Sequence, residues 1–188
     1  MSDSRAVLVV VVVIALVAIA AWVVARSRRR RRLQEQFGPE YPRAVRKYGG
    51  VTQAESALTA RRERVRRLDI RPLRSADAGH FAAAWRDAQA RFVDDPPVAI
   101  AHADRLVQEV MHARGYPVGD FDERVDDISV DHPAVVEHYR TAHEIAIASG
   151  EGRTTTEDLR QAMRHYRALF EDLLEIYDDP PRQMEAGR

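Results

Sequence analysis

Cysteine is absent from this 188-residue chain, and its absence excludes disulfide bonds, C-x-x-C metal sites and a thiol nucleophile. Lysine is nearly absent too, since Lys47 stands against 28 arginines. The chain also lacks a G-x-S-x-G motif, a G-x-x-x-x-G-K-[ST] phosphate loop and an H-E-x-x-H motif. Three common signatures of hydrolases, nucleotide-binding proteins and zinc peptidases are therefore missing.

The chain does contain one long apolar run, the twenty consecutive apolar positions of residues 6–25. Twenty helical residues rise about 30 Å, the thickness of a bilayer hydrocarbon core. We therefore expect an uncleaved transmembrane helix over 6–25, preceded by a short N-terminal tail at 1–5. A cleaved signal peptide is the alternative, because Ala18 and Ala20 resemble an A-x-A cleavage site.

Six arginines follow this run within seven positions, whereas only Arg5 precedes it. The positive-inside rule then predicts a single-pass protein of the bacterial inner (plasma) membrane, with its N-terminus outside and its C-terminal domain in the cytoplasm. Anionic lipids are the expected partners of the basic block. The expected lipid-contacting side chains are Arg26, Arg28, Arg29, Arg30, Arg31 and Arg32.

The formal net charge of zero hides a separation of charge along the chain. Residues 26–74 hold 16 basic and 5 acidic side chains, whereas residues 75–188 hold 12 basic and 23 acidic ones. This contrast predicts a basic juxtamembrane linker and stalk helix over 26–74, followed by an acidic helical bundle over 75–177. A disordered tail is expected at 178–188.

Apolar residues recur at spacings of three and four, which predicts an all-α fold: one transmembrane helix, a basic helical stalk and a bundle of about four to five helices. Capping residues locate the helix ends. We expect N-caps at Asp77, Asp95, Asp131 and Thr155 or Thr156, a C-cap at Gly115, and a capping box of Thr52 with Glu55.

Five short segments stand out in the chain: RFVDDP at 91–96, RGYP at 114–117, SVDHP at 129–133, Y-R-x-A-H at 139–143 and TEDLR at 156–160. Together they resemble a family of bacterial proteins with one N-terminal membrane span and a helical cytoplasmic domain, often labelled "secreted protein". The resemblance covers most of residues 26–176. It implies architecture only, since no activity or catalytic residue comes with it.

Seven histidines raise the question of a metal site. A di-iron bundle needs two Glu-x-x-His pairs, but the chain offers one, Glu109 with His112, and a looser Asp77 with His80. His138 and His143 are five positions apart and do not share a helix face well. We therefore expect no catalytic residue, no metal and no cofactor.

The arginines between 61 and 74 could neutralise nucleic-acid phosphates, but no aromatic side chain lies among them to stack on bases, so this function is not favoured. Loops between helices place aromatic and polar groups together and form a possible recognition surface. Its members are Tyr116, Phe121, Asp131 and His132. Capping and turn formation are the alternative explanation.

These observations favour a membrane-anchored helical binding or scaffold module for a protein partner that the sequence does not name. One alternative is a metal-binding or enzymatic bundle that uses the histidines. Another is a structural envelope protein that acts through homo-oligomers, because the apolar stripe over 159–174 could also pack between chains.

Overall fold

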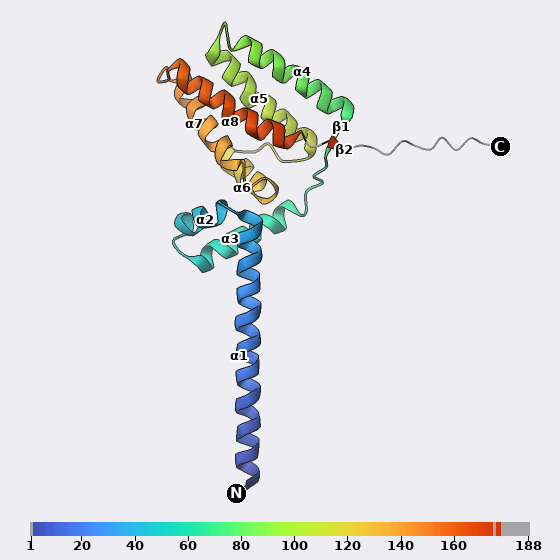
Figure 1. Ribbon diagram of the computed structural model, residues 1–188, viewed down its shortest axis with the longest axis vertical. Helices are drawn as coiled ribbons and strands as arrows, with labels where there is room; N and C mark the ends of the chain where they lie inside the picture. The colour runs from blue at the N-terminus through green and yellow to red at the C-terminus, as the bar shows by residue number, and fades with distance from the viewer. Residues whose placement is uncertain (1, 175, 178–188) are drawn as a thin grey trace, which may run out of the picture. The chain divides into compact units, whose positions relative to one another are not determined.

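The computed structural model describes the backbone of residues 2–174 and 176–177, and the side chains of residues 13–174. Figure 1 shows a chain built of helices, so the all-α prediction for the chain outside its N-terminal segment is confirmed. The helices are α1 (Ser2–Phe37), α2 (Glu40–Tyr48), α3 (Val51–Val65), α4 (Ser75–Arg91), α5 (Pro96–Arg114), α6 (Phe121–Asp131), α7 (Val136–Gly150) and α8 (Thr156–Leu173).

The predicted transmembrane helix is wrong. Among the residues that the structure describes, no helix combines the length and the apolar character needed to cross a membrane. The side chains of residues 6–12 lie outside the described part, and α1 continues through the arginines to Phe37.

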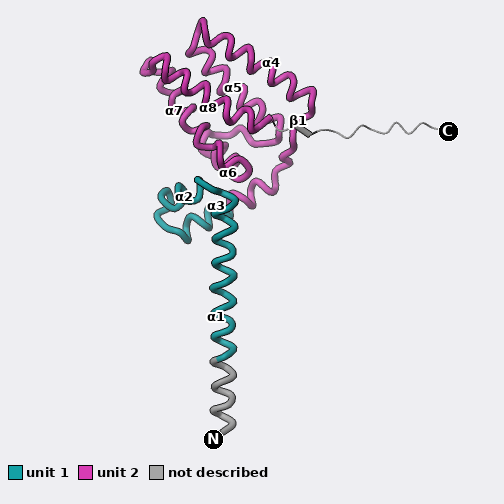
Figure 2. The backbone as a smooth tube through the Cα atoms, in the orientation of Figure 1, with its two compact units in different colours: residues 1–59 teal, residues 60–188 magenta. Residues whose placement is uncertain are grey.

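The chain divides into two compact units, Met1–Thr59 and Ala60–Arg188, and Figure 2 colours them separately. The division falls inside α3, within the segment predicted as a stalk. In the first unit, the end of α1 packs against α2 and α3. The buried apolar residues there are Leu33, Phe37, Tyr41, Ala44, Ala54 and Leu58.

The predicted capping box of Thr52 and Glu55 is wrong, because α3 begins one residue earlier, at Val51. Its first turn is closed by a backbone hydrogen bond from Ala54 to Gly50, so Thr52 already lies inside the helix. Glu55 instead accepts a hydrogen bond from the buried Tyr41 hydroxyl at 3.1 Å. Burial, aided by this carboxylate, raises the pKa of Tyr41.

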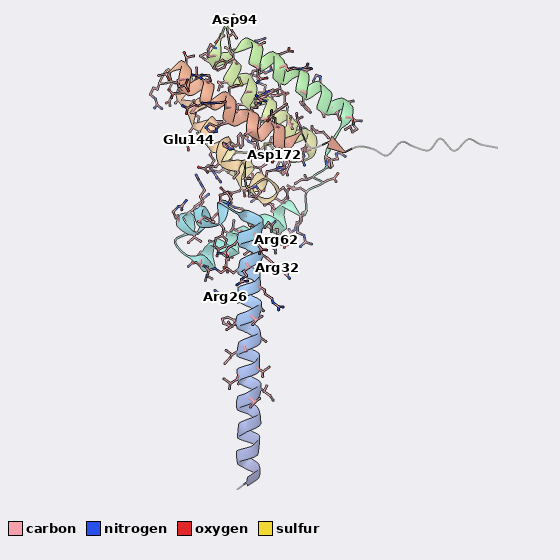
Figure 3. All side chains as sticks on the ribbon, viewed as in Figure 1. Arg26, Arg32, Arg62, Asp94, Glu144 and Asp172 are labelled. Carbon is pink, nitrogen blue, oxygen red and sulfur yellow. The ribbon has the colours of Figure 1, made fainter. Side chains whose placement is uncertain are left out.

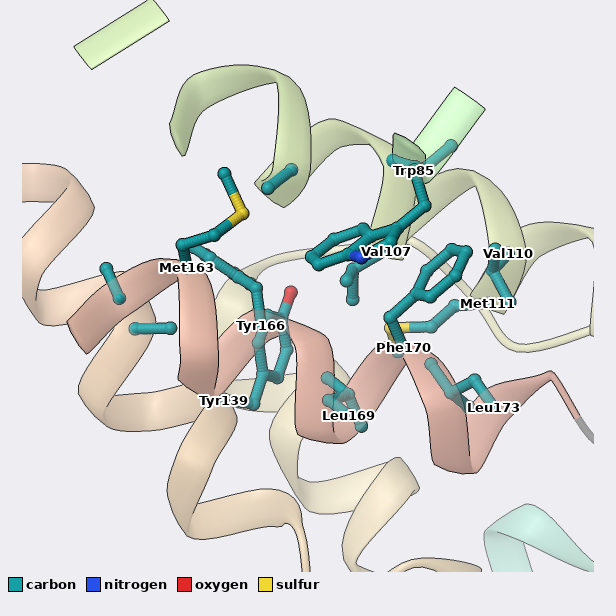
Figure 4. Close-up of a cluster of buried hydrophobic side chains, with 14 of the residues drawn as sticks. Trp85, Val107, Val110, Met111, Tyr139, Met163, Tyr166, Leu169, Phe170 and Leu173 are labelled. Atoms are coloured by element: carbon teal, nitrogen blue, oxygen red, sulfur yellow. The ribbon is translucent and has the colours of Figure 1, made fainter. Parts of the chain in front are cut away.

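The second unit is a bundle of α4 to α8. Short loops join α4 to α5 and α7 to α8, and α8 packs against both α5 and α7. The stripe expected on α8 is the centre of the core: Figure 4 shows Tyr166, Leu169, Phe170 and Leu173 pointing into it. Trp85 of α4 stacks on Phe170, with ring centroids 4.6 Å apart.

Local capping chemistry fixes several ends of these helices. The Asp95 carboxylate accepts a hydrogen bond from the Val98 amide at 3.2 Å, and Gly115 ends α5 with a φ of 97°. Thr155 and Asp158 form a reciprocal capping box on α8. These three predicted caps are confirmed.

Two other predicted caps are wrong. Asp77 lies within the first turn of α4, where it pairs with Arg74 at 2.8 Å, because the helix already begins at Ser75. Asp131 is the last residue of α6, and α7 begins only at Val136.

A two-residue strand pair closes the second unit, with β1 (Leu73–Arg74) parallel to β2 (Ile176–Tyr177). Leu73 is opposite Ile176 in the register. The predicted disordered tail at 178–188 lies outside the described residues.

Candidate functional site

A carboxylate on α5 forms the centre of a polar site within the bundle. Asp104 Oδ1 accepts a hydrogen bond from the Tyr166 hydroxyl of α8 at 2.9 Å, and its Oδ2 accepts one from Gln108 Nε2 at 2.7 Å. Its side chain remains 20% exposed. The carboxylate is therefore anchored on one side and accessible on the other.

His143 of α7 lies next to this carboxylate. Its Nδ1 is 3.8 Å from Asp104 Oδ1, which is an ion-pair distance but too long for a hydrogen bond. This buried Nδ1 has no hydrogen-bond partner among the described atoms. The imidazole stacks on Phe121 of α6, with centroids 3.7 Å apart and an interplanar angle of 12°. Phe121 thus fixes the plane of the ring.

These two polar groups lie along a cleft between the beginning of α5 and the end of α7. The cleft has a volume of about 410 Å³. Val98 on α5 and Ile147 on α7 line it and are 44% and 52% exposed. The remaining lining residues are Pro97, Ile100, Ala101, Ala146, Ser149 and Gly150. An apolar cleft with few polar groups in this size range is typical of a ligand-binding site.

Electrostatics favour the ionised form of Asp104. Burial raises its pKa, but the neighbouring His143, the hydrogen bond from Tyr166 and the positive charge of Arg124 outweigh burial, so the pKa of Asp104 is lowered. Burial and the same carboxylate raise the pKa of Tyr166. The tyrosine consequently stays protonated and donates to a carboxylate that stays charged.

A second buried polar group supports this site from α6. Arg124 Nε donates to the Tyr139 hydroxyl at 3.2 Å, and Arg124 Nη1 donates to the Gly119 carbonyl at 2.5 Å. Burial raises the pKa of Tyr139 to about 12, so this hydroxyl also remains neutral. Arg124 joins the loop before α6 to α7 and lies 5.9 Å from the centre of the Phe121 ring.

The four residues predicted as a recognition surface separate into two places. Phe121 belongs to the Asp104 cleft through its stacking on His143. The other three join the end of α5, the end of α6 and the end of α8. The buried Tyr116 donates to Asp131 Oδ2 at 2.9 Å, and its ring contacts that of His132.

His132 in turn bridges two elements. Its Nδ1 is 2.5 Å from Asp172 of α8, and its Nε2 is 3.5 Å from Arg114. Arg114 also donates to the Leu173 carbonyl at 3.2 Å, at the end of α8. These contacts hold the helix ends together.

The arginines expected at a lipid surface also divide into two sets. Arg26 and Arg29 donate to Thr52 and Thr59 of α3 at 3.4 and 3.1 Å, and Arg30 lies 4.0 Å from Glu55. Within the described part of the chain, no charged or hydrogen-bonding partner reaches the exposed side chains of Arg28, Arg31 and Arg32. In Figure 3, Arg26 and Arg32 extend outward from α1.

Two arginines of the predicted stalk pair with the acidic helix α6. Arg61 lies 2.6 Å from Asp126, and Arg64 lies 2.5 Å from the buried Asp127. Burial raises the pKa of Asp127, although Arg64 opposes the shift. These two basic side chains therefore balance charge inside the second unit.

The histidines do not assemble a metal cluster. Among residues 13–174, whose side chains the structure describes, no three His, Asp or Glu residues converge on a common point. Glu109 and His112 are both exposed on α5. His138 and His165 do meet across α7 and α8, with their Nδ1 atoms 2.8 Å apart, as a hydrogen-bonded pair.

A second hollow, of about 670 Å³, lies beside β1 and is lined by Arg71, Arg74, Asp77 and Ala113 among others. Its charged side chains are exposed, and Arg74 already pairs with Asp77. It therefore lacks the desolvated polar group that distinguishes the Asp104 cleft.

Sequence reasoning missed Asp104 and His143 as a pair. One signal could have identified Asp104: it shares an α5 face with Ile100, Val107 and Met111, all of which are buried.

Comparison with protein families, curated proteins and solved structures finds no match to this chain. The functional argument therefore depends on the geometry of the site.

Proposed function

We propose that this protein is a helical binding module whose ligand occupies the cleft between α5 and α7. The observation that carries the proposal is the combination of two exposed aliphatic side chains, Val98 and Ile147, above the anchored Asp104 carboxylate. Exposed apolar groups around a defined polar group provide affinity and orientation together.

Binding is favoured over catalysis by the contacts of the polar groups. Asp104 is held by Tyr166 and Gln108 rather than by a hydrogen bond to His143. A catalytic histidine is usually oriented by a hydrogen bond to its carboxylate partner. The 3.8 Å between His143 and Asp104 is too long for a hydrogen bond that would orient a catalytic histidine, but it leaves the carboxylate able to bind a ligand.

The test is ligand-observed NMR of the full chain with small apolar probes, beginning with 1-hexanol. We expect saturation transfer to hexanol, and we expect Ala101→Trp, which fills the cleft, to abolish it. Ala90→Trp on α4, at a position exposed like Ala101 and outside the cleft, is the matched control and should bind like the unmodified chain. Equal signals from both variants would contradict the proposed site.

A second candidate function is contact with an anionic lipid surface, which is favoured by the exposed guanidinium groups of Arg28, Arg31 and Arg32, because no residue described by the structure pairs with them. Guanidinium groups bind phosphate through paired hydrogen bonds. We expect co-sedimentation with phosphatidylserine-containing vesicles to weaken between 50 and 500 mM salt, on the order of tenfold. Replacement of the three arginines by glutamine should remove this salt dependence. Equal binding to neutral and anionic vesicles would contradict the proposed lipid contact.

A further inference from the structure

We propose that the α5–α7 cleft selects a small molecule that carries a primary ammonium group on an apolar chain. The inference depends on the proposed function and adds the chemical class of the ligand. It begins with the acceptor capacity of Asp104, because a carboxylate offers about four acceptor positions. Tyr166 and Gln108 occupy two of them.

The free positions of Asp104 face the cleft, since this residue lines it and keeps a fifth of its side chain exposed. His143 does not occupy them, because its Nδ1 stays 3.8 Å away. A ligand that donates hydrogen bonds and carries positive charge fits this arrangement best, because hydrogen bonds to an ionised acceptor are the strong ones.

The neighbourhood argues against an anionic ligand. The positive charge of Arg124 acts on Asp104, but this arginine is already bound to Tyr139 and Gly119. The described lining of the cleft contains no lysine or arginine. A carboxylate ligand would therefore meet the charge of Asp104 with no lysine or arginine of the described lining to compensate it.

The rest of the cleft sets the apolar part of the ligand. Aliphatic and small side chains of α5 and α7 form its walls, chiefly Val98, Ile100 and Ile147. An alkyl chain can cover the exposed parts of Val98 and Ile147 while its ammonium group reaches Asp104. The volume of about 410 Å³ suits a free small molecule, to which the proposal commits.

The experiment compares three probes of equal chain length on the full chain at pH 8, where histidine side chains are ordinarily neutral. Hexylamine, 1-hexanol and hexanoate are titrated by ligand-observed NMR. We expect hexylamine to bind at least about tenfold more tightly than hexanol, and hexanoate to bind more weakly than both.

The matched variants are Asp104→Asn and Asp87→Asn, the latter on the exposed face of α4. Asp104→Asn should lose the preference for hexylamine and keep hexanol binding, whereas Asp87→Asn should change neither. A thermal unfolding curve for each variant confirms that it folds.

Each possible failure has a distinct meaning. Equal binding of hexylamine and hexanol would overturn the amine proposal while leaving the binding module intact. No binding of any probe would overturn both. Tighter binding of Nα-acetyl-lysinamide than of hexylamine would identify a protein lysine as the occupant and would overturn the choice of a free amine.

Discussion

Neighbouring side chains on other helices determine the protonation of single polar residues in this bundle. Asp104 keeps its charge because Tyr166 of α8 donates to it, and Tyr139 keeps its proton because burial disfavours the phenolate. His138 and His165 show the same effect, since each imidazole is the other's hydrogen-bond partner across α7 and α8.

This histidine pair predicts a pH dependence of stability. Burial, then the neighbouring His138 and Arg164, lower the pKa of His165 below its ordinary value near 6.5. The unfolded chain therefore binds a proton more readily than the folded one. The stabilisation is present above about pH 6.5 and is lost as the pH falls through the folded pKa.

We expect the melting temperature to fall between pH 7.5 and pH 5.5 and expect His165→Asn to flatten that fall. The exposed His80 on α4 provides the control, because His80→Asn should leave the dependence unchanged. An identical pH profile for His165→Asn and the unmodified chain would show that the pair does not contribute.

At the scale of elements, the end of α5 is the most constrained turn in the described chain. Gly115 has a φ of 97°, and a Cβ atom at this position would lie 2.3 Å from the Asp69 carbonyl oxygen. Gly152, between α7 and α8, has a φ of 69° and open space where its Cβ would be. A residue with a Cβ atom would be strained by the positive φ at either position. Only at Gly115 would that Cβ also collide with another segment.

Alanine substitutions should therefore have unequal effects. Gly152→Ala should cost about 1 kcal/mol from its left-handed backbone alone. Gly115→Ala should cost several kcal/mol, because the backbone at Asp69 must also move. Denaturant unfolding of both variants measures the difference, and equal losses would show that Asp69 yields easily.

Helix existence and several helix ends could be predicted from the sequence because their signals are local. The apolar stripe of α8 and the Asp95 cap depend on residues within a few positions of one another. The prediction of Asp131 as an N-cap is wrong, although an Asp two residues before a Pro is typical of a helix start. Asp131 instead ends α6, where its carboxylate accepts a hydrogen bond from Tyr116.

The Asp104 site could not be assembled from the sequence for a related reason. Its groups come from four helices, α5, α6, α7 and α8, and only packing brings them together. Each is unremarkable alone: an acid, a histidine, a phenylalanine and a tyrosine in amphipathic helices. The predicted membrane span is wrong for a different reason, because the helix that carries the apolar run, α1, continues through the arginine block to Phe37.

For the whole molecule, the separated charge is partly neutralised within the second unit. Arg61 and Arg64 pair with Asp126 and Asp127, so the basic stalk and the acidic bundle are not independent charge blocks. The apolar surface of α1 has no such compensation. Eight large apolar side chains between Val13 and Val24 are each about half exposed.

Exposed apolar surface of this extent predicts self-association of the full chain. We expect light scattering to report oligomers that persist at 500 mM salt, where contacts between exposed charges are largely screened. A triple variant, Leu16→Gln, Ile19→Gln and Val23→Gln, should shift the population to smaller species. Oligomers that dissociate at 500 mM salt would instead indicate association through the separated charges.

One small contact gives the α5–α7 cleft a built-in reporter. The amide of Val98 is held by the Asp95 cap, and the side chain of the same residue forms the rim of the cleft. Fraying of the first turn of α5 therefore opens the rim and releases this proton to solvent in a single event. A bound ligand that covers Val98 should slow hydrogen exchange at that amide. The exchange rate of this single hydrogen therefore reports how much of the cleft is occupied.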